Sequence, residues 1–115
     1  MKTGNYYGET IEVIKTRAEP LGIDIIIGDE DTDIKDEIFC GIISYPGTLG
    51  DIKDPSEAIS KIHKQNGKAV LVCDLLALAK LKTPAELGAD IAVGSSQRFG
   101  IPMGYGGPHA AFFAT

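Results

Sequence analysis

Apolar residues recur along this chain with two different periods, and each period predicts one kind of element. Three segments, residues 10–21, 55–65 and 75–81, carry apolar side chains at the spacing of one helical face and are predicted to be helices. In the first two, the residues predicted to face inward are Ile11, Ile14, Ala18, Ala58, Ile59 and Ile62. Pro20 and Gly22 are predicted to end the first helix.

Between the helices lie short apolar runs, several of them β-branched, which predict strands. The predicted strands are residues 23–27, 39–45, 69–73, 90–94 and 109–114. Strands that alternate with helices favour right-handed crossovers and a parallel sheet with helices on both faces, so the predicted fold class is α/β. The last strand follows a glycine-rich stretch instead of a helix and is therefore expected to be antiparallel. A chain of 115 residues has room for one domain.

Composition narrows the possible partners. Hydrophobic residues make up 43% of the chain and charged residues 23%, which is typical of a globular protein. The net charge of -5 argues against nucleic acid, whose phosphates require a basic surface. No apolar run approaches the ~20 residues needed to span a membrane, and no signal peptide precedes the first helix. Cys40 and Cys73 lie in apolar stretches, which predicts buried thiols in a reducing, cytoplasmic setting.

Ligands of open α/β sheets bind beyond the carboxyl ends of the strands, so the residues after each strand are the candidates for a site. Asp74 ends the most apolar strand, where a carboxylate suits the protonated ring nitrogen of a cofactor. The same position fits the N-cap of the helix that follows, and the sequence leaves both interpretations open. Ser95 and Ser96 could donate to a phosphate, although paired serines at a strand end are also ordinary turn residues.

Metal binding is not predicted. His63 and His109 have no cysteine, aspartate or glutamate beside them at the spacing of metal ligands. His109 is a candidate for hydrogen bonding near a pocket, or a structural histidine. The acidic stretch 29–33 lacks the glycine and glutamate that a calcium loop requires, because Ile34 and Cys40 occupy those positions, so a solvated turn is expected.

The most specific stretch reads Gly-Ser-Ser-Gln-Arg-Phe-Gly-Ile-Pro-Met-Gly-Tyr-Gly-Gly-Pro-His-Ala-Ala-Phe-Phe over residues 94–113. It resembles the amino-terminal half of glycine decarboxylase, the P-protein of the glycine cleavage system. Three further matches, residues 16–22, 45–50 and 88–91, extend the resemblance over residues 10–115. Residues 1–9 do not match and are expected to be a leader or an expression remnant.

The resemblance implies that residues 10–115 are part of the large domain of a fold-type I pyridoxal-phosphate-dependent transferase. Enzymes of this family decarboxylate glycine and pass the aminomethyl group to the lipoyl arm of the H-protein. They consist of two related halves, fused or separate, and the carboxy-terminal half carries the lysine that binds the cofactor. Here Gln97 stands in the place of that lysine. An amide cannot form an imine with an aldehyde, so the chain is predicted to be the lysine-less half, with no catalytic residue of its own.

The resemblance also implies partners. Pyridoxal phosphate belongs to the parent enzyme and is not expected on this segment, so any cofactor contacts of Asp74, Ser95, Ser96 and His109 would be vestigial. The implied partners are the lysine-bearing half, or subunit 2, and the H-protein. Sheet edges exposed in the segment would favour self-association. The alternatives are an interaction module that docks the lysine-bearing half and, ranked last, a stand-alone nucleotide or phosphoacceptor domain built on Asp74 and residues 29–33.

Overall fold

A computed structural model describes residues 8–28 and 37–115. The acidic stretch 29–33 and most of the expected leader, residues 1–7, lie outside the described residues. In chain order the elements are α1 (Gly8–Ala18), η1 (Glu19–Leu21), β1 (Cys40–Tyr45), α2 (Ser56–Lys64), β2 (Lys68–Asp74), α3 (Leu75–Leu78), β3 (Ile91–Ser95), η2 (Gln97–Phe99) and β4 (Ala111–Ala114). None of the helices in the described ranges is long and apolar enough to cross a membrane.

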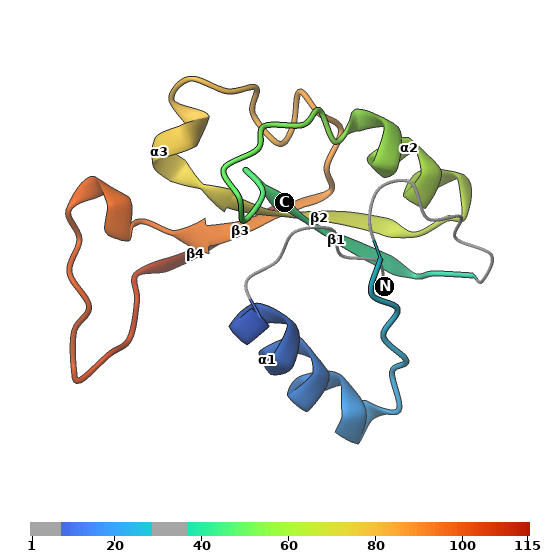
Figure 1. The fold of residues 1–115 in the computed structure, drawn as a ribbon, viewed down its shortest axis with the longest axis horizontal. Helices are drawn as coiled ribbons and strands as arrows, with labels where there is room; N and C mark the ends of the chain where they lie inside the picture. The colour runs from blue at the N-terminus through green and yellow to red at the C-terminus, as the bar shows by residue number, and fades with distance from the viewer. Residues whose placement is uncertain (1–7, 29–36) are drawn as a thin grey trace.

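The four strands form one sheet in the order β1-β2-β3-β4. The first three are parallel, and β4 is antiparallel to β3. Figure 1 shows α2 and α3 on one side of the sheet and α1 on the other. The predicted α/β class and the antiparallel last strand are therefore confirmed.

The core lies between β2 and the helix α2. Ala69, Leu71 and Cys73 alternate along β2 with their side chains buried, and Ile59 and Ile62 of α2 pack onto them. The side chains on the other face of β2, such as Val70, are only half-buried. The almost continuous apolar sequence of this strand predicted that both of its faces are buried. In the structure, only the side chains on the face toward α2 are fully buried.

The helix boundaries follow the predicted signals with small differences. Gly22 adopts a φ of 65° directly after η1, and its N–H donates to the carbonyl of Glu19 at 3.0 Å, so the predicted stop is confirmed. The first helix begins at Gly8, two residues earlier than expected. The helix predicted over residues 75–81 is shorter, because α3 ends at Leu78.

The strand predicted over residues 23–27 is wrong. These residues are not part of any described strand, and within the described ranges β1 pairs only with β2. A strand needs a neighbour to complete its hydrogen bonds, and β-branched composition alone does not supply one. Ile23 and Ile25 instead line a cavity of about 560 Å³ between α1 and β1, whose other walls include Ile14 and Ile42.

Candidate functional site

Two of the candidate site residues lie at the carboxyl ends of β2 and β3. Asp74 is the last residue of β2, Ser95 is the last of β3, and the two are register partners in neighbouring strands. The carboxyl ends of neighbouring parallel strands lie side by side, which is why two residues 21 positions apart in sequence meet here. The structure therefore brings these two candidate residues together.

The carboxylate of Asp74 already has two partners. One oxygen, Oδ1, accepts from the N–H of Leu76 at 2.9 Å, and the backbone of Asp74 is extended, so this residue is the N-cap of α3. The other oxygen, Oδ2, lies 3.4 Å from Nε of Arg98. The N-cap interpretation is thus confirmed, while a role toward a cofactor stays a prediction.

The hydroxyls of both serines have backbone partners, one within the turn and one across the base of the loop that follows. The Ser95 hydroxyl accepts from the N–H of Gln97 at 3.2 Å. The Ser96 hydroxyl and the Ser96 N–H both donate to the carbonyl of Ala110 at 2.9 Å. These contacts place the exposed His109 in the loop beside the site, next to Ala110. Phosphate binding by these groups stays a prediction.

Gln97 occupies the start of η2 directly after this turn, and its side chain is exposed. No lysine follows Lys82 in the sequence. The only cationic side chain among residues 83–115 is Arg98, whose guanidinium points to Asp74. Arg98 lies inside the long sequence motif, but nothing in the spacing of that motif connects it with Asp74, 24 positions earlier.

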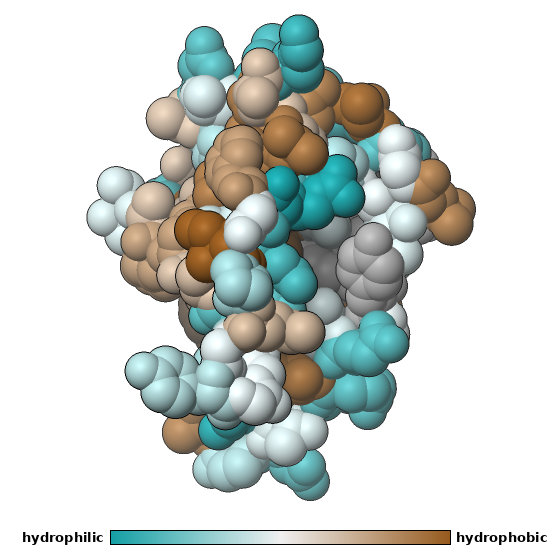
Figure 2. All heavy atoms as spheres, turned by 90° about the vertical axis from the view of Figure 1, so that its left-hand side faces the viewer, coloured by the Kyte–Doolittle hydropathy of each residue, from teal (hydrophilic) through white to brown (hydrophobic). Residues whose placement is uncertain are grey.

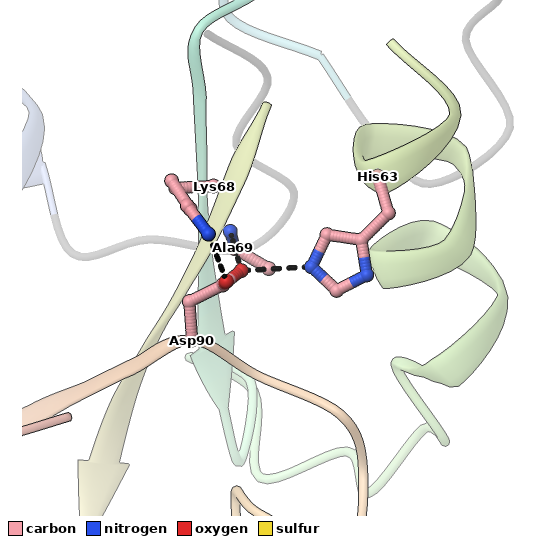
Figure 3. Close-up of polar contacts among 4 residues, drawn as sticks. All are labelled: His63, Lys68, Ala69 and Asp90. Carbon is pink, nitrogen blue, oxygen red and sulfur yellow. Dashed lines mark hydrogen bonds and ion pairs between the residues drawn. The ribbon is translucent and has the colours of Figure 1, made fainter. Parts of the chain in front are cut away.

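A second polar cluster lies at the amino-terminal ends of β2 and β3. The sequence did not predict it. Asp90 accepts from Nζ of Lys68 at 2.8 Å, from the N–H of Ala69 at 2.8 Å and from Nε2 of His63 at 2.7 Å. Figure 3 shows these groups converging on the carboxylate from α2 and from the start of β2. The hydrogen bonds from Lys68, Ala69 and His63 hold the pKa of Asp90 far below its ordinary value. The only sequence signal was Asp90 itself, as part of the motif at residues 88–91.

The two cysteines have environments that suit structural residues. Cys73 is buried in the core, and burial raises the pKa of its thiol to about 11. Cys40 is half-buried at the start of β1, and burial is also the main reason for its raised pKa. Neither thiol is in a disulfide. A thiol with a raised pKa is a poor nucleophile, because the reactive form is the thiolate.

Comparisons with known proteins agree on one family. The family model described as glycine cleavage system P-protein matches residues 3–115. The matched range begins inside the nine residues that the sequence analysis set apart, and a domain boundary at residue 10 stays a prediction. The chain is 86% identical over 111 residues to the glycine dehydrogenase (decarboxylating) of Pelagibacter ubique and 54% identical over 108 residues to that of Gluconobacter oxydans.

The same comparisons show how small a part this chain represents. The two alignments cover 96% and 93% of this chain but only 12% and 11% of the relatives. A crystal structure of glycine decarboxylase (P-protein), in inhibitor-bound form, matches with a TM-score of 0.83 and 31% identity over 99% of this chain and 28% of that one. An O-acetylhomoserine sulfhydrylase of Wolinella succinogenes shares the fold, with a TM-score of 0.68 at 16% identity.

Proposed function

Since this chain belongs to the glycine cleavage system P-protein family, we propose that it is a segment of a glycine decarboxylase that transfers the aminomethyl group of glycine to a lipoyl H-protein and releases carbon dioxide. It comes from the half without the cofactor-binding lysine and is inactive alone. The observation that carries this proposal is Gln97, an exposed amide in the place of the required amine, within a chain that spans 12% of its relative.

The groups at the carboxyl ends of β2 and β3 do not fit pyridoxal phosphate as they stand. Both oxygens of Asp74 are engaged, by Leu76 and Arg98. Arg98 thus supplies the positive charge that a pyridinium would otherwise bring to this carboxylate. The Ser96 hydroxyl donates to the carbonyl of Ala110, and the Ser95 hydroxyl accepts from the N–H of Gln97. These contacts support the proposal that the cofactor is held by the other half of the enzyme.

Exposed apolar surface supports a role within a larger assembly. The edge of β1 that faces away from β2 has no partner strand among the described residues, and the cavity of about 560 Å³ beside it is lined mainly by apolar side chains. Surface of this kind is normally covered by another part of the protein. We propose that the lysine-bearing half, or subunit 2, is the main partner, with the H-protein bound by the complete cytoplasmic enzyme.

A chimera tests the proposal. In the Gluconobacter relative, the 108 aligned residues would be replaced by the matching part of this chain, which is 54% identical. The chimera is expected to release carbon dioxide from glycine when lipoyl H-protein is supplied, at a rate within a few-fold of the parent. A folded chimera with normal cofactor content but no activity would count against the proposal.

The same chimera tests which half holds the cofactor. Borohydride reduction followed by mass spectrometry is expected to place the pyridoxyl-lysine outside the exchanged segment, because Gln97 cannot form the imine. The matched control is the parent enzyme treated in the same way. Stoichiometric labelling of a lysine inside the segment would refute the assignment to the lysine-less half.

A further inference from the structure

The junction between α2 and β2 contains Asn66 followed by Gly67, the only place in the sequence where a glycine follows an asparagine. This junction lies at the right-hand end of the sheet in Figure 1, whereas Figure 2 looks onto the opposite end, where apolar side chains reach the surface. Asn66 is exposed and Gly67 is buried. An asparagine–glycine pair is chemically labile in peptides, because glycine has no side chain to shield its backbone nitrogen from the neighbouring side-chain amide.

The fold itself requires both residues of this labile pair. Asn66 adopts a φ of 59° directly after α2, and asparagine is the residue that most often replaces glycine in this left-handed position at a helix end. A Cβ at Gly67 would come within 2.8 Å of the carbonyl oxygen of Ile38 and within 3.0 Å of Cγ2 of Ile62. The turn therefore selects asparagine at the first position and glycine at the second.

The hydrogen bonds that end α2 oppose a reaction between the two residues. The N–H of Gly67 donates to the carbonyl of Ile62 at 3.1 Å, and the N–H of Asn66 donates to the carbonyl of His63 at 2.9 Å. The nitrogen of Gly67 must lose its proton before it can attack the side chain of Asn66. As long as that proton is donated to the carbonyl of the buried Ile62, the nitrogen is not available. We term residues 62–67 the α2 cap.

We propose that the Asn66–Gly67 junction is a site of spontaneous deamidation whose rate is controlled by opening of the α2 cap. In the open cap, the backbone nitrogen of Gly67 loses its proton to water and attacks Cγ of Asn66. A bond forms between this nitrogen and Cγ, the bond from Cγ to the side-chain nitrogen breaks, and that nitrogen takes up a proton and leaves as ammonia. Water then opens the succinimide ring at one of its two carbonyls, which gives aspartate or isoaspartate.

The two products have different consequences for the fold. Aspartate keeps the length of the backbone and, like asparagine, tolerates a positive φ. Isoaspartate adds one carbon to the backbone between α2 and β2. The added carbon displaces the N–H of Gly67 from the carbonyl of Ile62, and the N–H of Lys68 from the carbonyl of Phe39, to which it donates at 2.9 Å. A chain that carries isoaspartate is therefore expected not to re-form the α2 cap.

The contacts of Asp90 hold the two sides of the junction together. Figure 3 shows that its carboxylate accepts from His63 on the last turn of α2 and from Lys68 and Ala69, which follow Gly67. These bonds connect the residues on both sides of the α2 cap through one side chain. Loss of this carboxylate is expected to increase opening of the cap without any change in the Asn66–Gly67 pair.

Peptide mapping by mass spectrometry provides the first test. Aspartate and isoaspartate at position 66, distinguished by electron-transfer fragmentation, are measured over time in a mildly alkaline buffer with and without guanidinium chloride. Without denaturant, the chain is expected to react at least about tenfold more slowly, because the reaction waits for local opening. A peptide of residues 61–70, measured in both solutions, corrects for any effect of the denaturant on the chemistry. Equal corrected rates would overturn the inference.

A matched pair of substitutions tests the role of the cap. Asp90→Ala is expected to accelerate deamidation of Asn66 several-fold in buffer and to leave its rate in denaturant unchanged. Asp54→Ala is the control, because Asp54 bonds the N–H of Ser56 and Lys82 at the other end of α2, and it is expected to leave both rates unchanged. Equal acceleration by both variants, or none by Asp90→Ala, would contradict control by the α2 cap.

Discussion

At the scale of single residues, Asp90 and Asp74 make different structural contacts at opposite ends of the strands. Asp90 ties the end of α2 to the start of β2 through three donors, and its carboxylate has no predicted chemistry. Asp74 starts α3 and pairs with Arg98. The sequence offered the N-cap as one of two interpretations of Asp74, because capping depends on residues two positions apart. It did not predict the contacts of Asp90, whose partners lie 21 to 27 positions away.

The first prediction concerns Asp90→Asn. The folded state lowers the pKa of Asp90 from the ordinary 3.8, so ionised Asp90 stabilises the fold at pH values above that and loses its contribution as the pH falls below it. The variant is expected to unfold at lower urea concentration at pH 7, with a difference from the original chain that shrinks below pH 4. Asp24→Asn, at an exposed position, serves as the control. A difference that does not depend on pH would contradict this account.

At the scale of elements, the close packing of β3 against β4 depends on a glycine. A Cβ at Gly94 would overlap the carbonyl of Cys73 and come within 2.7 Å of the ring of Phe112, which is its register partner on β4. No other residue type fits this position without movement of the neighbouring strands. The sequence marked Gly94 as the end of a strand and the start of the long motif, but it gave no sign of this close packing, because the neighbours of Gly94 come from two other strands.

The second prediction follows from that contact. Gly94→Ala is expected to lower the free energy of unfolding by about 1–3 kcal/mol, the usual cost of overpacking. Gly104→Ala is the matched control, since a Cβ there meets nothing within 4 Å, and it is expected to change stability by no more than about 0.5 kcal/mol. Urea unfolding of both variants provides the measurement. Equal stabilities would show that the strands yield around Gly94.

The incorrect strand prediction at residues 23–27 shows that local composition alone does not determine whether a segment becomes a strand. Its composition favours extended backbone, and the residues do lie in an irregular segment beside the sheet. Whether such a segment becomes a strand depends on whether it pairs with a neighbouring strand, and residues 23–27 pair with none of the described strands. The helices were predicted better, because a helix satisfies its hydrogen bonds within its own segment.

At the scale of the whole molecule, the sheet has two edge strands, β1 and β4, and neither has a second partner strand among the described residues. The strand β1 contains no charged residue that would discourage edge-to-edge pairing, and Phe39 at its entrance is exposed beside the apolar cavity. We expect the self-association predicted from the sequence to occur at this edge.

The third prediction tests that edge. In sedimentation experiments the isolated chain is expected to gain apparent mass as its concentration rises. Phe39→Lys is expected to weaken this association on the order of tenfold, because a charge at the edge opposes strand pairing. Leu49→Lys, also at an exposed position, is expected to have no effect. If both lysine variants weakened the association equally, the β1 edge would not be the site of self-association.

The sequence by itself determined the family, the α/β class, the antiparallel last strand and the absence of an amine at position 97. These depend on local patterns and on the identity of single residues. Only the tertiary structure decided that Asp74 pairs with Arg98, that Asp90 joins α2 to the sheet, and that residues 23–27 line a cavity instead of forming a strand. Such contacts join residues distant in sequence, and their formation depends on which neighbours the folded chain supplies.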